Sequence, residues 1–447
     1  MPKVRATKPS RRDVVRLAAA TAAAGPFVAF PDRTLASQQT LKIAKWAHFL
    51  PEYDEWFAGA LAEAWGRQHD TKVVVDHIPV ESIHAVAAAE VAAGSGHDVF
   101  MFPWPPAEFH KHAIDHGEIY QTVAFKFGNL DRFAHRSTLD PRAKKYFAFA
   151  DSWIPTPFHY FEDHWREAGM PLGPIHYGSL RSGGRRIRQA LGVPCGLALA
   201  PSLESNITWH TLLYAFRGQV IDAAGNVTIG KTAFSIEALK YAKALYEDAG
   251  TPDQLAWGPS GNVRAMLARK TSCTVNAINL LRTAEKEEPE VASKIRLSPP
   301  LLGSGGAGVL AFPHVTNCSV VWNFAQNQEG AKQFLADLID NSKTAYEKSA
   351  GCNFPIYQKT VPDLIVRLED DPRADPPFKY KELKDALRWT RNLGFPGYAN
   401  PVAMEVFNSF VIPRMFISVV TGQSSPEDAV QVAAAEVARI ADRWKQV

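Results

Sequence analysis

The segment Leu41-Lys42-Ile43-Ala44-Lys45-Trp46 alternates apolar and polar residues, which is typical of a half-buried β-strand. A second strand is predicted at Lys72-Val73-Val74-Val75-Asp76. Between the two strands, apolar residues recur at helical spacing: Trp56, Phe57, Ala60, Leu61, Ala64 and Trp65. Together these segments predict a βαβ unit, whose two strands run parallel.

The same alternation continues along the chain. A helix is predicted from Ile83 to Ala93 and a strand at Asp98-Val99-Phe100-Met101-Phe102. Further strand patterns cover 146–150 and 317–324, and helical patterns cover 160–169, 209–217, 236–246 and 328–341. This order indicates an α/β fold with parallel sheets, in which ligands bind at the carboxyl ends of the strands. Trp46 and the Pro103-Trp104-Pro105-Pro106 loop fall at such ends.

The last helix has a clear start signal. Ser425 can cap it, Pro426 suits its first position, and Asp428 completes a capping-box pattern. We therefore expect a helix from this point to the end of the chain.

The N-terminus has the pattern of an export leader. Ser10-Arg11-Arg12-Asp13-Val14-Val15-Arg16 resembles a twin-arginine signal, and an apolar run follows over 17–30. That run is too short and too alanine-rich to span a bilayer. We expect a leader over 1–36 with cleavage after Ala36, or secondarily after Ala24, and a periplasmic or extracellular location; the alternative is a basic arm joined to a buried helix.

Net charge offers no sign of a nucleic-acid or membrane partner. The leader holds seven of the 49 basic residues and two of the 46 acidic ones, so 42 and 44 remain. Such a near-neutral body lacks the excess of positive charge that nucleic-acid binding needs.

The four cysteines, Cys195, Cys273, Cys318 and Cys352, show no Cys-x-x-Cys spacing. Structural zinc and thioredoxin-like chemistry therefore lack their motif. Two alternatives are kept for these cysteines: a disulfide, or four buried thiols.

Several motifs in order resemble the carbohydrate-binding, maltose-binding-protein-like branch of the extracellular solute-binding proteins of ABC importers. The matching segments, in chain order, are Gly96 to Phe100, Leu191 to Pro194, Trp209 to Val220, Asp222 to Ile229, Glu329 to Leu335, Gly351 to Pro355 and Gly422 to Ala429. Each motif is loose, but their order covers nearly all of the chain after the leader.

The resemblance implies a two-lobed, type II periplasmic-binding-protein-like fold. Each lobe would be a mostly parallel sheet flanked by helices, with the ligand cleft between the lobes. The N-terminal lobe would take 38–145 and 308–357, and the C-terminal lobe 146–307 and 358–447. The glycine-rich segment 303–308 is the best candidate for the return passage. The resemblance also implies a monomer that passes its solute to a membrane permease.

A sugar site needs indole faces for the C–H faces of pyranose rings. Five tryptophans at loops or element ends are the candidates for stacking, each with a packed core indole as its alternative: Trp46, Trp104, Trp153, Trp209 and Trp257. Three others fit helical apolar stripes and are predicted to be core: Trp56, Trp65 and Trp444.

Polar groups are needed to bind the sugar hydroxyls. The main candidates are Asp98, Asn276, Asn279 and Arg282, with Tyr398, Glu52 and Asp54 as weaker ones. Arg282 alternatively indicates a carboxylated or phosphorylated solute, because its planar fork suits both groups.

Other functions have weaker support. Glu108, His112 and His116, four residues apart on an expected helix with His110 nearby, form a possible metal site, although we expect no metal and no cofactor. Gly-x-Ser-x-Gly is absent and no carboxylate pair is marked for catalysis, so we expect no enzyme. A carbohydrate receptor is the first hypothesis. An exported glycan hydrolase or lyase, or a metal or polyamine receptor, is the alternative.

Overall fold

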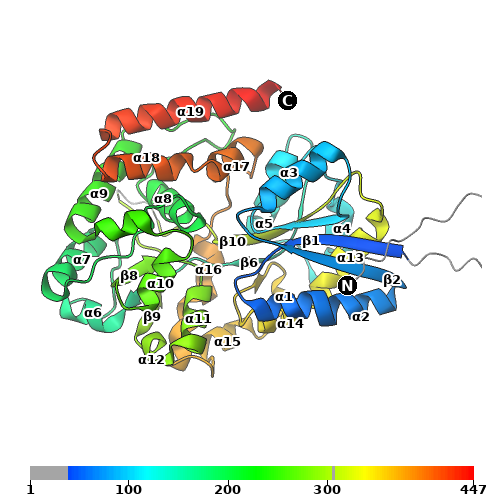
Figure 1. Cartoon of the computed structure of the whole chain (residues 1–447), viewed down its shortest axis with the longest axis horizontal. Coiled ribbons are helices and arrows are strands. Elements are labelled where there is room, and N and C mark those ends of the chain that lie inside the picture. Colours follow the sequence, from blue (N-terminus) through cyan, green and yellow to red (C-terminus); the bar gives the residue numbers. More distant parts are fainter. Residues whose placement is uncertain (1–38, 305–307, 447) are drawn as a thin grey trace, which may run out of the picture. The chain divides into compact units, whose positions relative to one another are not determined.

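The computed structural model describes residues 39–304 and 308–446, so the predicted leader and its cleavage positions lie outside the described residues. The body is built around two principal sheets, each the centre of one lobe (Figure 1). The first-lobe sheet has six strands in the order β11-β6-β10-β3-β1-β2, and the second-lobe sheet has three in the order β8-β7-β9. The strands are β1 Gln39–Trp46, β2 Thr71–Ile78, β3 Val99–Phe102, β4 Leu139–Asp140, β5 Lys145–Tyr146, β6 Phe149–Ile154, β7 Phe158–Phe161, β8 Cys273–Val275, β9 Ile295–Ser298, β10 Val315–Val321 and β11 Phe354–Pro355.

Helices fill the connections between these strands. Between β1 and β6 they are α1 Pro51–Trp56, the π-helix η1 Phe57–Leu61, α2 Ala62–Gln68, α3 Ile83–Ala93, η2 Ala107–Phe109, α4 Gly117–Phe127 and α5 Arg132–Thr138. Between β7 and β9 they are α6 Glu162–Glu167, α7 Tyr177–Leu191, α8 Leu203–Ala215, α9 Phe234–Ala249, η3 Pro252–Ala256, α10 Gly261–Leu267, α11 Asn279–Glu287 and α12 Pro289–Ala292. After β10 they are α13 Gln328–Asp340, α14 Ser342–Lys348, η4 Gln358–Thr360, α15 Leu364–Glu369, η5 Pro377–Asp385, α16 Ala386–Trp389, α17 Pro401–Asn408, α18 Val411–Val420 and α19 Pro426–Gln446.

The predicted βαβ unit is confirmed. β1 pairs in parallel with β2, from Gln39 opposite Thr71 to Trp46 opposite Ile78, and also with β3. The chain moves from β1 outward to β2 and then back across to β3. The two crossovers run in opposite directions along the sheet, and α1–α2 and α3 lie on its opposite faces (Figure 1), as right-handed crossovers require.

The prediction that each lobe has a mostly parallel sheet is wrong. In the first lobe β10 runs antiparallel to β3 and β6, and β11 runs antiparallel to β6. In the second lobe β7 runs antiparallel to both β8 and β9. The physical reason lies in the passages between lobes: β6 leads out of the first lobe and β10 leads back in, so neighbours in the sheet point in opposite directions.

The strand pattern near residue 146 was expected to open the second lobe, but β6 belongs to the first-lobe sheet, where Ile154 lies opposite Val315 of β10. The chain therefore passes to the second lobe at Pro155–Pro157, later than the expected boundary at 145. Every residue of β6 is buried, so its sequence carries no alternation that would show which sheet it joins.

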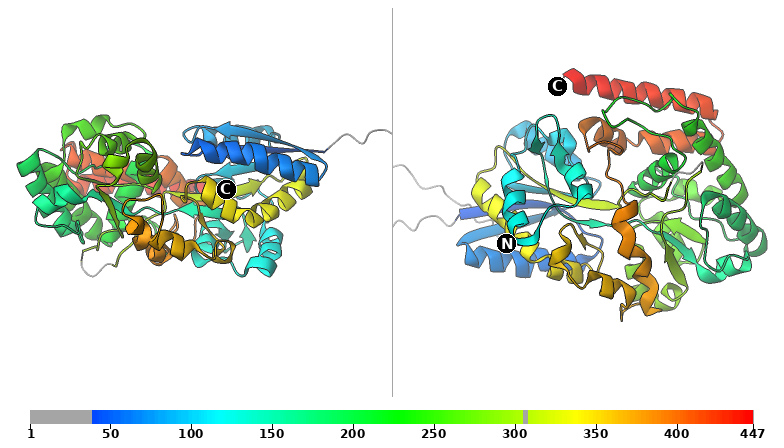
Figure 2. Two further views of the ribbon diagram at one scale, coloured as in Figure 1. Left: turned by 90° about the horizontal axis from the view of Figure 1, so that it is seen from below. Right: turned by 180° about the vertical axis from the view of Figure 1, so that it is seen from behind.

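The terminal helix begins as predicted, since Ser425 Oγ accepts a hydrogen bond from Asp428 N at 3.0 Å. Helices α18 and α19 pack with α9 beside the second lobe (Figure 2). All four cysteines are buried and free. Among the described residues no single helix is long and apolar enough to cross a membrane, although α17 and α18, bent by 44°, meet such a criterion as a pair.

Candidate functional site

The candidate site lies where the chain passes between the lobes. His314 N donates to Ile154 O at 3.1 Å, so the outgoing and returning segments lie side by side. Just beyond His314, Thr316 N donates to Pro103 O at 2.8 Å, which brings the loop after β3 to the same place. The carboxyl ends of β1 and β3 therefore face the passage into the second lobe.

Three rings after β1 line the first-lobe side. Trp46 ends β1 and has its ring centroid 5.1 Å from that of His48 and 5.2 Å from that of Phe49. The half-buried Phe49 ring lies edge-on to His314, with centroids 5.7 Å apart. Trp46 and His48 are buried, so of these rings only half-buried Phe49 leaves apolar surface open beside the passage between the lobes.

His314 and Thr156 are buried polar residues of the passage, and each has one polar side-chain atom without a partner. Neither His314 Nδ1 nor Thr156 Oγ1 has a hydrogen-bond partner among the described residues. Burial lowers the pKa of His314 to about 4, although Glu204 favours its charged form. Because an unpaired buried polar atom is costly, both atoms are suited to a bound solute or water.

Glu204 carries the site into the second lobe. It lies in the first turn of α8, whose start is fixed by a capping box between Ser202 and Ser205. Glu204 Oε1 accepts a hydrogen bond from Ser260 N at 3.0 Å. This contact holds the loop before α10, which begins with Trp257, against the start of α8.

Trp257 differs from the other tryptophans. Of the eleven in the chain, all of them within the described residues, ten belong to the hydrophobic core or pack against it, and Trp257 does not. Its indole is half-buried, which leaves apolar ring surface open to a ligand.

A series of hydrogen-bonded side chains fixes the Trp46 ring. Trp46 Nε1 donates to Asn317 Oδ1 at 2.9 Å, Asn317 Nδ2 to Ser152 Oγ at 2.8 Å, and Ser152 Oγ to Asp151 Oδ1 at 2.5 Å. Burial raises the pKa of Asp151 to about 7. Lys45, buried beside this series, pairs with Asp54 at 2.6 Å. The series fixes the edge of the Trp46 indole and so the direction of its faces.

A second series of hydrogen-bonded side chains joins the lobes at the η2 loop. Trp104 Nε1 donates to Asn408 Oδ1 at 3.0 Å, and Asn408 Nδ2 donates to Glu108 Oε1 at 2.9 Å. Glu108 also lies 2.8 Å from His84 Nδ1, and the His84 ring stacks on Trp104 at 5.1 Å. Asn408 of α17 thus hydrogen-bonds to two first-lobe side chains.

Comparison with known proteins places this geometry on a familiar scaffold. No protein-family model matches the sequence, and no curated protein matches it. Solved structures match over nearly the whole body. A sugar transporter from Arthrobacter chlorophenolicus A6 with bound laminaribiose is 13% identical, covers 90% of this chain and 99% of its own, and has a TM-score of 0.75.

Two further structures agree. An ABC transporter solute binding protein from Thermotoga lettingae TMO bound with α-D-tagatose is 14% identical, with a TM-score of 0.74. Maltose-bound T. maritima MalE3 is 19% identical, with a TM-score of 0.72. Both comparisons cover 90% of this chain and 99% of the other. The chain has the type II periplasmic-binding-protein fold.

Within this fold, two tryptophans predicted to stack on sugar lie in the core instead. Trp153 is 1% exposed, with its ring packed between Phe133 and Phe354. Trp209 is fully buried and stacks on Phe416 at 4.9 Å. Neither indole has a free face, so we leave both out of the proposed site.

Asp98 is also structural. Its Oδ2 accepts from Lys42 N at 2.9 Å, and its Oδ1 accepts from Gln326 N at 2.8 Å and Asn327 N at 2.9 Å. Asp98 precedes β3 and therefore lies at the end of the strand opposite the site. Its role is to tie β1 to the start of α13.

Asn276 is turned inward as well, because its Nδ2 donates to Asn262 Oδ1 at 3.1 Å and its Oδ1 accepts from Ala277 N at 2.7 Å. Asn279 begins α11, and its Oδ1 is buried without a partner among the described residues. The ring of half-buried Tyr398 lies 5.8 Å from that of His135, with the Arg136 guanidinium 5.8 Å from its centroid. Asn279 and Tyr398 stay predictions.

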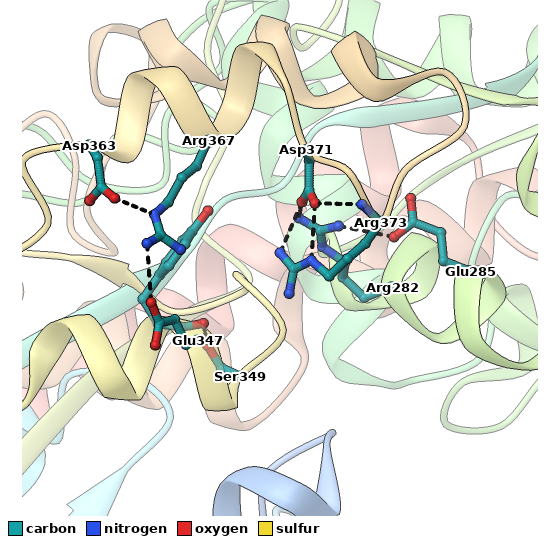
Figure 3. Close-up of polar contacts among 9 residues, drawn as sticks. Arg282, Glu285, Glu347, Ser349, Asp363, Arg367, Asp371 and Arg373 are labelled. Atoms are coloured by element: carbon teal, nitrogen blue, oxygen red, sulfur yellow. Dashed lines mark hydrogen bonds and ion pairs between the residues drawn. The ribbon is translucent and has the colours of Figure 1, made fainter.

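Arg282 is used in a buried ion-pair network (Figure 3). Its Nη2 lies 2.6 Å from Asp371 Oδ2 and its Nη1 lies 3.0 Å from Glu285 Oε2. The guanidinium also covers the Tyr380 ring at 3.7 Å. Burial opposes ionisation of Asp371, yet Arg373 and Arg282 lower its pKa to about 2. These partners occupy both Nη atoms of Arg282, and its buried Nε has no partner among the described residues.

The two weaker acidic candidates are paired: Glu52 with Lys286 of α11, and Asp54 with Lys45. Glu52 thus joins the start of α1 to the second lobe.

The metal alternative loses its geometry. The segment expected to be a helix is the short η2 followed by turns, so Glu108 and His112 do not share a helical face with His116. His116 accepts from Val321 N at 3.0 Å through Nε2, and its Nδ1 lies 2.9 Å from Tyr146 O. His110 Nδ1 lies 2.9 Å from Ala107 O. Within 39–304 and 308–446, no group of three or more metal-ligating side chains is found.

Sequence reasoning missed the residues His48, Phe49, Thr156, Glu204, Ser260 and His314. A signal existed for His48 and Phe49, which directly follow a predicted strand, and for Glu204, which follows the capping Ser202. For His314 there was none, because only the pairing of β6 with β10 shows that it lies at the passage between lobes.

Proposed function

We propose that this chain is an extracytoplasmic receptor that binds a carbohydrate between its two lobes and delivers it, chemically unchanged, to the membrane permease of an ABC importer. It acts as a monomer, without a cofactor, and is not an enzyme. Residues 1–36 direct its export by the twin-arginine route. The fold supports this proposal, since structures with the same fold were solved with laminaribiose, tagatose and maltose.

The observation that carries the proposal is Trp257, a half-buried indole outside the core. It belongs to the same loop as Ser260, whose contact with Glu204 brings the loop toward His314 and the Phe49 ring. We place the sugar between the half-buried ring of Phe49 in the first lobe and that of Trp257 in the second. Pyranose rings present apolar C–H faces that pack well on such surfaces, and each stacked ring adds about 0.5–1.5 kcal/mol beyond its area burial.

The polar groups of the same location suit hydroxyls. Glu204 accepts hydrogen bonds, Thr156 Oγ1 is free to donate or accept, and His314 Nδ1 is unpaired. Burial keeps His314 neutral at physiological pH, so it offers one donor or acceptor and no full charge. A neutral, hydroxyl-rich solute satisfies these atoms at lower desolvation cost than an ionic one does.

The test is a thermal-shift screen of the full chain against mono-, di- and oligosaccharides, polyols, polyamines and divalent metal ions. At 100 times its dissociation constant a ligand stabilises the folded state by about 2.7 kcal/mol, so a specific sugar should raise Tm by several degrees. Tm shifts with only polyamines or metal ions would contradict the proposal.

Variants of Trp257 then locate the site. Trp257→Ala should weaken binding of the sugar found in the screen by about tenfold, and Trp257→Phe by less, because a flat face remains. Trp444→Ala, which removes a half-buried indole on α19, is the matched control and should leave the affinity unchanged. The sugar should also be recovered intact after long incubation. A cleaved product would mean that the chain is a glycan-active enzyme.

A further inference from the structure

A groove of about 500 Å³ lies at the far end of α8 from Glu204. Its walls come from the end of α8 and the turn after it, from 228–234, from 308–310 and from 391–395; the residues that matter here are Tyr214, Arg217, Lys231, Phe234, Arg391 and Phe395. Glu204 and Tyr214 are ten residues apart on one helix, which separates the groove from the candidate sugar site by about 15 Å.

Of the described residues that line the groove, three are cations and none is a carboxylate. In the part of the chain that the structure describes, Arg217, Lys231 and Arg391 form no ion pair, whereas Arg367 and Arg282 each pair with two acids. Three positive charges without an ion-pair partner at one groove produce a local field that attracts anions, although Lys231 also interacts electrostatically with Asp222.

Aromatic rings hold two of these cations in place. The Arg217 Cζ lies 4.6 Å from the centroid of Phe234, and the Arg391 Cζ lies 5.6 Å from the centroid of Phe395. Arg391 uses Nη1 to donate to the carbonyls of Arg388 and Thr390, at 2.9 and 3.0 Å. Stacking on a ring leaves the in-plane donors of Arg217 available for a bidentate oxyanion, while Arg391 keeps Nε and Nη2 for one.

The backbone at Arg217 is unusual. The turn after α8 puts Arg217 in the left-handed region, at φ +68°, where glycine is favoured, although the next residue is Gly218. The chain thus carries a long cationic side chain at a position that disfavours one. Strained positions of this kind cluster at functional sites.

Two features oppose anion binding, and both are weaker than the three cations. The C-terminal end of α8 carries about half a negative charge. Asp222, which interacts electrostatically with Lys231, is held by its own turn, since it accepts from Ala224 N and from Asn226 N and Nδ2 at 2.9 Å each. Arg132 and Arg136 add to the positive field, because burial lowers the pKa of Arg391 and these two charges lower it further.

We propose that this groove binds a small organic anion that carries phosphate or carboxylate groups, at a second site separate from the sugar site. The volume exceeds what a bare oxyanion needs and lies within the range of small-molecule sites, so the occupant has an organic body that contacts Val309 and Leu310. Arg217 and Arg391 bind the oxyanion and Lys231 adds charge.

Isothermal titration calorimetry on the full chain tests this, with citrate, phenyl phosphate and inorganic phosphate as probes. Citrate or phenyl phosphate should bind with a dissociation constant of about 100 μM or lower, and about fivefold more tightly than inorganic phosphate. Whichever of the two binds more tightly identifies the preferred oxyanion. Failure of both to bind would overturn the proposal.

Variants distinguish the site from general charge. Arg217→Gln should weaken binding about tenfold, and adding Arg391→Gln should abolish it. Lys270→Gln removes an exposed lysine outside the groove and should have less than a twofold effect; an equal loss in Lys270→Gln and Arg217→Gln would overturn the proposal. Phe234→Leu, which removes the ring under Arg217, should give an intermediate loss with the charge unchanged.

The sugar site serves as an internal control. Arg217→Gln should keep the sugar-induced rise in Tm, which also shows that the variant is folded. If the wild-type chain binds sugar but none of the anions, only this inference is refuted. If it binds an anion but shows no response to any sugar, only the proposed function is refuted.

Discussion

Replacing Arg282 by methionine should destabilise the protein without affecting its ligand. Arg282 joins α11 to the segment after α15 through Asp371 and Glu285, and its side chain is only 2% exposed (Figure 3). The change keeps most of the apolar stem over Tyr380 and removes the charge. It therefore isolates the ion pairs from packing.

The expected cost follows from burial. Removing one partner of a buried ion pair costs about 3–5 kcal/mol, because the remaining charge has no counterpart. Here Asp371 keeps Arg373, which lies 2.9 Å from its Oδ2, whereas Glu285, 11% exposed, loses Arg282. We therefore expect a loss near the lower end, about 3 kcal/mol in the free energy of unfolding.

A neighbouring network supplies the matched control. Arg367 contacts Asp363 and Glu347 with similar geometry, but these side chains are 33%, 39% and 47% exposed (Figure 3). Solvent screens such pairs, so Arg367→Met should cost about 0.5 kcal/mol. Urea unfolding followed by tryptophan fluorescence measures both variants. A cost for Arg282→Met below 1 kcal/mol, or no larger than for Arg367→Met, would refute the structural role. Loss of ligand binding at unchanged stability would make Arg282 a ligand-binding residue instead.

Three further predictions concern polar groups that are buried or half-buried. The pKa of Asp151 rises from 3.8 to about 7 on folding, so the free energy of unfolding of the wild type should fall by up to about 4 kcal/mol as the pH rises through this window. Asp151→Asn should therefore raise Tm more at pH 8 than at pH 4. An equal rise at both pH values would be inconsistent with this. Buried histidines with lowered pKa take up protons only on unfolding, so stability should fall as pH drops from 6.5 to 4 by about 1.4 kcal/mol per unit for each, and unfolding without net proton uptake at pH 5 would disagree. Those histidines are His48, His116, His159, His210 and His314. Asn408→Ala should lower the free energy of unfolding in urea by about 2 kcal/mol, because it loses the hydrogen bonds to Trp104 and Glu108. Asn408→Asp adds a like charge beside Glu108 and should cost at least as much. No change in either variant would argue against this link between the lobes.

Local sequence patterns were sufficient for the elements with strong periodicity. The alternation at 41–46 predicted β1, the helical spacing after it predicted α1–α2, and the bounds of α3 were predicted correctly. The caps at Ser425 and Pro426 located the start of α19. In each case the signal is contained within about 20 residues, and the structure adds no long-range partner that would change it.

Features that depend on distant partners were not predictable in this way. Sheet direction at β10 depends on where the chain re-enters the first lobe. Trp153 and Trp209 lie near predicted loops in the sequence. In the structure, Phe354 covers Trp153 and Phe416 covers Trp209, and each of these partners is more than 190 residues away along the chain. The same holds for Arg282, whose partner Asp371 is 89 residues away. Trp257 was predicted as a stacking residue from its position in a loop, and its indole is half-buried outside the core.

The central claim is that one sugar contacts both lobes at once, and hydrogen exchange measured with and without the sugar tests it most directly. Sugar should slow amide exchange both at 47–49, after β1, and at 257–260, before α10, while α19 stays unchanged. Protection confined to one lobe, or found only away from these two segments, would contradict the account.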